Sequence, residues 1–307
     1  MSIVVENLTK QYGVQKAVNN ISFEIKTGEV VGFLGPNGAG KSTTMKMITC
    51  YMSPSAGNIL LDGISVLDQP EEVKKKIGYL PENNPLYTDM PIVEYLKFAA
   101  EIQGVEKTLI PSRIAEMIEM CGLSVEKHKK ISELSKGYRQ RVGIAQAMIH
   151  DPEVLILDEP TTGLDPNQII EIRKLIKKLG KEKTVILSSH ILSEVEATCD
   201  RILIINRGNI VADGSSENLR QQAQGQEILT VCIEGPKQEV ESALRDLASV
   251  EKVSVLDHKQ GFLQVQSKPD KESRKVIFDM CVAKNWYLLE MTGIETRLED
   301  VFRDLTN

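Results

Sequence analysis

One nine-residue stretch, Gly35–Thr43, constrains this chain more than any other part of its sequence. It has a glycine, four residues, a second glycine, and then lysine and serine. The apolar run Val30–Leu34 before it predicts a buried strand, and the residues from Thr43 onward predict a helix. In that setting, glycines let backbone N–H groups close around phosphate oxygens, and the start of the helix favours negative charge. The stretch therefore predicts a nucleotide-phosphate site rather than an ordinary glycine-rich turn.

In this stretch, the backbone N–H groups and the side chains are expected to make different contacts with the nucleotide. Lys41 would reach the β- and γ-phosphate oxygens, and the Ser42 hydroxyl would ligate Mg²⁺. All nine are candidate nucleotide contacts: Gly35, Pro36, Asn37, Gly38, Ala39, Gly40, Lys41, Ser42 and Thr43.

Two carboxylates follow a second apolar run. Val154–Leu157 predicts a parallel strand buried on both faces, and Asp158 and Glu159 come directly at its carboxyl end, where ligands bind in open α/β sheets. Asp158 would hold Mg²⁺, directly or through water, and Glu159 would polarise the attacking water. A further predicted strand, Thr184–Leu187, leads to His190, which is expected at the same edge of the sheet.

The composition is that of an ordinary soluble globular protein, with 41% hydrophobic and 26% charged residues in 307. A net charge of −6 argues against wholesale nucleic-acid binding. The five cysteines form no C-x-x-C pair and fit reduced thiols better than a disulfide framework or a zinc site. Glu6 and the absence of an early apolar segment argue against a signal peptide. No apolar run approaches the ~20 residues that span a bilayer, so any membrane role is expected to come through a partner.

The chain divides into two predicted domains, residues 1–224 and 225–307. A helical insert is expected over about residues 92–150. Within it, Ser135 is placed as the N-cap of a helix, which by itself is a weak indication of phosphate binding. The second domain shows a β-α-β-β-α-β order, typical of a ferredoxin-like split βαβ unit. It carries no catalytic constellation, so a packing or dimer-support role is favoured over a ligand sensor.

Together these motifs resemble the ATP-binding cassette of ABC transporters, over roughly residues 1–220. Gly35–Thr43 is similar to the Walker A motif, and Val154–Asp158 with Glu159 to the Walker B motif. Leu134–Tyr138 resembles the signature, Gly163–Asp165 the D-loop, and His190 the switch histidine.

The resemblance assigns roles that single residues would not reveal. Tyr12, which on its own fits side-chain packing better, lies where the family stacks an aromatic ring on adenine. Asp165 gains a catalytic role from the D-loop, and Ser135 and Gly137 gain contacts to ATP from the signature. Two departures stand out: Glu82 replaces the usual Q-loop glutamine as a contact to nucleotide and Mg²⁺, and Lys136 and Tyr138 replace a glycine and a glutamine.

The implied fold is an α/β P-loop domain with a mixed sheet and a helical insert, plus a small C-terminal α+β domain of the ferredoxin-like kind. The resemblance implies a Mg²⁺-dependent ATPase that forms a head-to-tail homodimer around two ATP molecules. Each ATP would contact one subunit's Walker A residues and the Ser135–Gly137 segment of the other subunit.

Glu82, the C-terminal domain and the closing Leu298–Thr306 segment are similar to the ABC-2 branch of exporters, and within it to cassettes associated with gliding motility. This implies an integral membrane permease as partner and a cytoplasmic location on the inner face of the membrane. Two alternatives stay open. A soluble ABC ATPase of translation or DNA repair usually carries paired cassettes or long coiled coils, and a P-loop phosphotransferase would lack the signature and His190.

Overall fold

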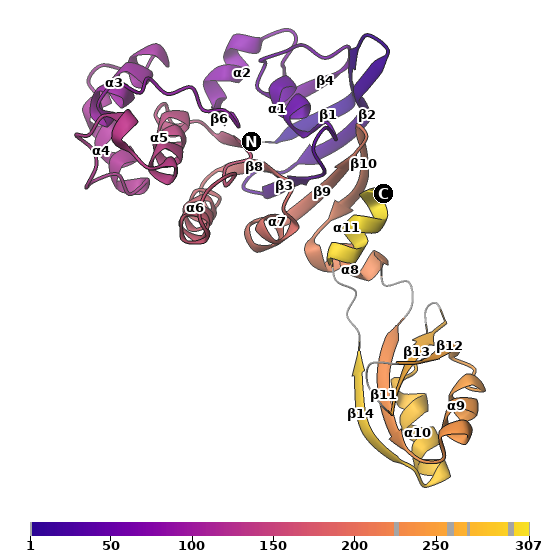
Figure 1. The fold of residues 1–307 in the computed structure, drawn as a ribbon. Coiled ribbons are helices and arrows are strands. Elements are labelled where there is room, and N and C mark those ends of the chain that lie inside the picture. The colour runs from indigo at the N-terminus through magenta and orange to yellow at the C-terminus, as the bar shows by residue number, and fades with distance from the viewer. Residues whose placement is uncertain (1, 224–226, 257–260, 269–270, 294–297, 307) are drawn as a thin grey trace. The chain divides into compact units, whose positions relative to one another are not determined.

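Figure 1 shows the fold in a computed structural model, which describes residues 2–223, 227–256, 261–268, 271–293 and 298–306. Close contacts divide the chain into two units: Met1–Ser216 together with Asp304–Asn307, and Glu217–Arg303. The predicted boundary at residues 224 and 225 lies outside the described residues. None of the described helices is both long and apolar enough to cross a membrane.

The first unit contains two sheets. The antiparallel sheet has the strand order β2 (Gln15–Ile25), β1 (Ile3–Tyr12), β4 (Ala56–Leu61) and β5 (Ile64–Ser65). The second sheet has the order β10 (Asn209–Gly214), β9 (Arg201–Asn206), β3 (Val30–Leu34), β8 (Thr184–Ser189), β7 (Val154–Asp158) and β6 (Ile77–Leu80). Only its β9–β10 pair is antiparallel, so the predicted mixed sheet is confirmed.

The central strands explain where the functional side chains lie. Every residue of β3, β7 and β8 is buried, as expected for parallel strands covered on both faces. In their register Leu34 pairs with Ser189, and Asp158 pairs with Ser188. The carboxyl ends of these three strands therefore meet at one edge of the sheet.

The helices of the first unit cover this sheet or form the insert. They are α1 (Lys41–Ile48), α2 (Pro70–Lys76), α3 (Ile92–Ile102), α4 (Ile110–Met120), the 3-10 turn η1 (Ile131–Glu133), α5 (Lys136–Met148), α6 (Pro166–Leu179) and α7 (Leu192–Thr198). Helix α8 (Ser216–Ala223) begins at the division, and all of it except Ser216 belongs to the second unit. The helices α3, α4 and α5 contact one another, and α5 also packs on β6 (Figure 1). The predicted helical insert is thus present.

The second unit is a four-stranded antiparallel sheet with two helices. Its elements are β11 (Ile228–Glu234), α9 (Lys237–Arg245), β12 (Val250–Val255), β13 (Phe262–Ser267), α10 (Arg274–Lys284) and β14 (Tyr287–Gly293). A last helix, α11 (Leu298–Thr306), runs across the division. The strand order β12-β13-β11-β14 inserts β13 between β11 and β12, which confirms the predicted split βαβ arrangement.

Candidate active site

The loop between β3 and α1 is shaped by glycines that contact neighbouring backbone. A Cβ on Gly40, whose φ is 112°, would lie 2.5 Å from the carbonyl oxygen of Ala17. A Cβ on Gly35 would lie 2.3 Å from the carbonyl oxygen of Ile205. Larger residues would push the loop away from the sheet, so the tight turn that exposes its N–H groups requires glycine here.

Lys41 is fixed inside this loop. Its Nζ donates to the carbonyl oxygens of Gly35 (2.8 Å) and Pro36 (3.3 Å). The same amine lies 3.5 Å from Glu159 Oε1, and the two side chains are only 6% and 7% exposed. A buried, pre-oriented cation is suited to bind phosphate oxygens, because little freedom remains to be lost on binding.

The hydroxyl of Ser42 and the carboxylate of Asp158 form the oxygen-rich part of the site. Ser42 Oγ donates to Asp158 Oδ1 (3.1 Å), and Ser188 Oγ donates to the same oxygen (2.6 Å). Ser188 Oγ in turn accepts from the backbone N–H of Glu159 (2.9 Å). The sequence alone gives Ser188 no role, because its pairing with Asp158 depends on the register of β8 against β7.

This donor set fits Mg²⁺. The Asp158 side chain is 1% exposed, and the groups that donate to its carboxylate are the hydroxyls of Ser42 and Ser188. No group of three His, Cys, Asp or Glu side chains placed to hold a metal ion occurs in the part of the chain that the structure describes. Mg²⁺ commonly takes one or two carboxylates, with water and substrate phosphates completing its shell, so Ser42 and Asp158 suffice as the protein's share.

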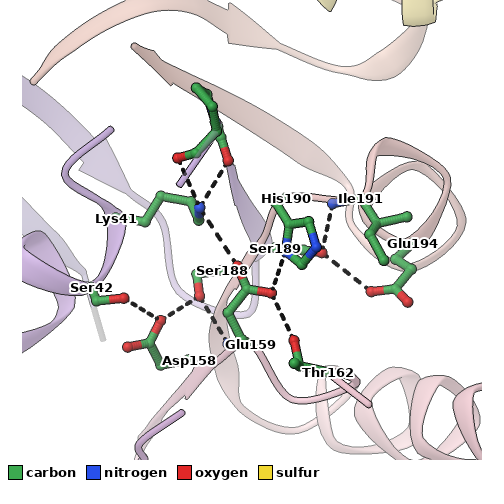
Figure 2. Close-up of polar contacts among 12 residues, drawn as sticks. Lys41, Ser42, Asp158, Glu159, Thr162, Ser188, Ser189, His190, Ile191 and Glu194 are labelled. Atoms are coloured by element: carbon green, nitrogen blue, oxygen red, sulfur yellow. Dashed lines mark hydrogen bonds and ion pairs between the residues drawn. The ribbon is translucent and has the colours of Figure 1, made fainter. Parts of the chain in front are cut away.

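Glu159 and His190 form a hydrogen-bonded pair beside Lys41 (Figure 2). His190 Nδ1 donates to Glu159 Oε2 (2.9 Å), because an ionised carboxylate only accepts. Thr162 Oγ1 donates to the same oxygen (3.1 Å). Glu159 has a left-handed backbone, with φ of 50°, which is strained for a residue with a long side chain. A strained, buried carboxylate with an adjacent histidine is an arrangement suited to proton transfer.

These groups open into one cavity of about 340 Å³. Its lining residues come from the glycine loop, the ends of β7 and β8, and the segments around residues 17 and 82: Ala17, Asn37, Gly38, Gly40, Lys41, Ser42, Thr43, Glu82, Glu159, Thr162 and His190. The cavity thus joins the predicted phosphate loop to the predicted base.

Comparison with known proteins decides the family. The ABC transporter family model matches residues 18–162. The linearmycin resistance ATP-binding protein LnrL of Bacillus subtilis (strain 168) is 36% identical over 304 residues, covering 98% of this chain and 97% of that protein. The chain belongs to the ATP-binding subunits of ABC transporters. It is therefore an ATPase.

Two further comparisons cover only part of this chain. The bacitracin transport ATP-binding protein BcrA of Bacillus licheniformis is 40% identical over 226 residues, covering 72% of this chain and 73% of that protein. The solved ATP-binding cassette MJ0796, in a dimeric post-hydrolysis state bound to ADP and Pi, aligns with a TM-score of 0.63 and 28% identity. That alignment covers 98% of MJ0796 but 69% of this chain.

Eight of the residues expected to serve an ABC cassette are absent from the described lining of this cavity. Four of them belong to the glycine loop or to β7, namely Gly35, Pro36, Ala39 and Asp158, and the other four come from other segments, namely Tyr12, Ser135, Gly137 and Asp165. Tyr12 ends β1 and is 50% exposed. The amine of Lys10 lies 5.5 Å from the Tyr12 ring centroid, and the Tyr12 hydroxyl contacts Met52 Sδ at 3.2 Å. The aromatic ring is thus held in place at the surface of the cassette.

Ser135, Gly137 and Asp165 belong to helix starts in the ABC cassette. Ser135 caps α5 by accepting from Tyr138 N (3.4 Å), and Asp165 caps α6 by accepting from Gln168 N (2.9 Å). Gly137 packs tightly on α6, since a Cβ there would lie 2.6 Å from Gln168 Cδ. These contacts fix both helix starts, and Ser135 keeps an exposed position.

Glu82 of the cassette lines two cavities. It is exposed, and it lines both the first cavity and a second one of about 440 Å³. The second cavity is also lined by Glu159 and Thr162 and by Lys136 and Arg139 of α5. Glu82 therefore lines both the cavity that contains Lys41 and the cavity that contains residues of α5.

Proposed function

We propose that this chain is the ATPase subunit of an ABC-2-type exporter, and that it works as a head-to-tail homodimer driving a separately encoded membrane permease. The observation that carries the proposal is the incomplete nucleotide site. Lys41 and Glu159 line the cavity, whereas Ser135 and Gly137 are not among its lining residues. A second copy that presents its Ser135–Gly137 segment would complete the site and add donors for the charge that develops during hydrolysis.

The chemistry proposed for this site is in-line attack of water on the γ-phosphorus. Glu159 accepts the proton of the water as the new O–P bond forms and the bond to the β-phosphate oxygen breaks. Lys41 and the loop N–H groups bind the phosphate oxygens, and His190 orients the base. Asp165 and Tyr12 are proposed to contact the partner subunit and the adenine, respectively.

Mg²⁺ would be held by Ser42 and Asp158, with Glu82 as a further oxygen donor. When bound, the ion neutralises charge on the phosphate oxygens. Ser42 and Asp158 already share a hydrogen bond, so the protein's two oxygen donors are positioned in advance.

The transport part of the proposal is supported by what the relatives are named for. LnrL is named for linearmycin resistance and BcrA for bacitracin transport. ATP would close the dimer, and hydrolysis with phosphate release would open it and move the permease. We therefore propose a cytoplasmic location on the inner face of the membrane, where the chain is attached through the permease. The narrower likeness to gliding-motility cassettes stays a prediction.

The C-terminal unit is proposed to be an accessory domain for packing or dimer support. Its support is the MJ0796 comparison, which spans nearly all of that cassette and only 69% of this chain. A domain of this kind is separable from the ATPase chemistry, because the residues proposed for that chemistry all lie in the first unit.

The test is capture of the partner from host membranes. Tagged Glu159→Gln protein, trapped with ATP, is used as bait on detergent-solubilised membranes, and Lys41→Ala protein is the matched bait that cannot hold ATP. We expect a multi-span protein without its own P-loop to be retained by the first bait and much less by the second. Recovery of only ribosomal or DNA-repair proteins would contradict the transporter assignment and favour the soluble-ATPase alternative.

A further inference from the structure

A second buried glutamate lies next to the Glu159–His190 pair. Glu194 is in the first turn of α7 and is 6% exposed. Its Oε2 accepts from Thr161 Oγ1 (2.5 Å) and from Ser189 Oγ (3.2 Å). Figure 2 shows the Ser189–Glu194 contact beside His190. No function assigned above uses this carboxylate.

The two hydroxyls belong to the segments that carry the catalytic pair. Thr161 lies two residues after Glu159, and Ser189 directly precedes His190. Ser189 is also fixed elsewhere: its Oγ accepts from Ile191 N (3.0 Å), and its carbonyl oxygen accepts from Gly35 N of the phosphate loop (3.4 Å). One carboxylate oxygen therefore joins the chain after β7 to the end of β8.

Glu194 forms no ion pair with any of the described residues. The groups that donate to its carboxylate are both hydroxyls. A buried carboxylate without a cation is costly, although hydrogen bonds to a charged group are strong and directional. The arrangement is therefore better suited to fixing geometry than to stabilising the fold.

We propose that Glu194 is a positioning residue for ATP hydrolysis, which sets the separation of Glu159 and His190 by tying Thr161 to Ser189. The proposal rests on the proposed roles of Glu159 and His190. Without the carboxylate both hydroxyls lose their acceptor, and the two segments can shift relative to each other. Displacement of about 1 Å at a reacting group can cost ~100-fold in rate, whereas ATP binding through Lys41 and the loop backbone is left intact.

The first experiment compares Glu194→Ala with Glu196→Ala. Glu196 lies on the same helix, where its carboxylate accepts from Ser216 Oγ (2.9 Å). For Glu194→Ala we expect kcat to fall ~10- to 100-fold while KM and ATP affinity stay within about threefold. Glu196→Ala is expected to keep the wild-type kcat. Equal kcat in wild type and folded Glu194→Ala protein would overturn the proposal.

Conservative variants separate positioning from general loss of structure. Glu194→Gln keeps an acceptor oxygen for both hydroxyls, so it is expected to restore most of the kcat lost in Glu194→Ala. If Glu194→Ala does not fold, the double variant Thr161→Val with Ser189→Ala removes both donors without a large void and should reproduce the kcat loss. A normal kcat in that double variant would contradict the proposal.

A double-mutant cycle with His190→Ala shows whether Glu194 acts through the pair. Adding Glu194→Ala to His190→Ala should cost less than about threefold, because the geometry it maintains is already lost. Full additivity would overturn the inference. Wild-type activity in His190→Ala or Glu159→Gln alone would instead refute the proposed roles of those residues, which is a separate failure.

Discussion

Both carboxylate oxygens of Glu159 contact other side chains, and these contacts predict the effect of replacing Glu159. Oε1 faces Lys41, while Oε2 accepts from Thr162 and His190. The carboxamide of Glu159→Gln has the same shape and can keep a hydrogen bond to Thr162, but it cannot take a proton from water. Loss of chemistry and retention of structure are therefore expected together.

We expect Glu159→Gln to lower phosphate release at least ~100-fold. Its ATP affinity should stay within about threefold of wild type. Single-turnover phosphate release and equilibrium nucleotide binding measure the two quantities. Glu182→Gln, an exposed glutamate in the turn after α6, is the control. Wild-type hydrolysis in Glu159→Gln would remove Glu159 as the base.

Glu82 should behave differently, although it lines the same cavity. It is exposed, and no hydrogen bond or ion pair to its carboxylate occurs among the described residues. A glutamine amide still offers an oxygen to Mg²⁺ or water. Glu82→Gln is therefore expected to keep steady-state ATPase activity within about threefold. Complete loss of activity would show that the charge of Glu82 has a specific task.

At the scale of elements, the end of α5 and the start of β6 are joined by a titratable contact. His150 Nε2 lies 3.2 Å from the carbonyl oxygen of Ile77. Burial lowers the pKa of His150 below its usual 6.5, and the charges of Arg113 and Lys183 lower it further, against the opposing effects of the Ile77 carbonyl and Asp151. The unfolded chain therefore binds this proton at a higher pH than the folded chain does.

Stability should consequently fall as pH drops below about 6.5, because the unfolded state then binds more protons than the folded state. His150→Gln can still donate to Ile77 and does not titrate. We expect its melting temperature to drop less than that of wild type between about pH 7.5 and pH 5.5. His128→Gln, at an exposed histidine of the insert, is the control. Identical pH profiles for wild type and His150→Gln would contradict this account.

At the scale of the whole molecule, the proposed dimer can be tested by mixing inactive subunits. Lys41→Ala damages a subunit's own phosphate site, and Ser135→Arg damages the site of its partner. Mixed in equal amounts, they should regain about a quarter of wild-type activity, since half of the dimers are mixed and each has one intact site. Lys41→Ala mixed with Glu159→Gln should stay inactive, because both changes damage the subunit's own site. Equal activity in the two mixtures would exclude head-to-tail pairing.

Much of this architecture could be predicted from the sequence because buried strands and glycine loops leave local patterns. The run Val30–Leu34 predicts β3 at its observed bounds, and the run Val154–Leu157 predicts β7 one residue short of its observed end at Asp158. The element order of the second unit follows from its amphipathic segments. The contacts of Ser188, Ser189 and Glu194 could not be predicted. These contacts depend on which strands are neighbours and on their register. The sequence around a hydroxyl at a strand end does not indicate which side chain it will contact.

The left-handed backbone of Glu159 predicts which residues a selection for thermal stability would favour at position 159. At φ of 50°, glycine or asparagine fits with less strain than glutamate, so either replacement should raise thermal stability. A library screened for heat resistance alone should therefore accumulate Gly or Asn at position 159, and each enriched clone should be a dead enzyme. Only a screen that also demands ATP turnover would retain glutamate there.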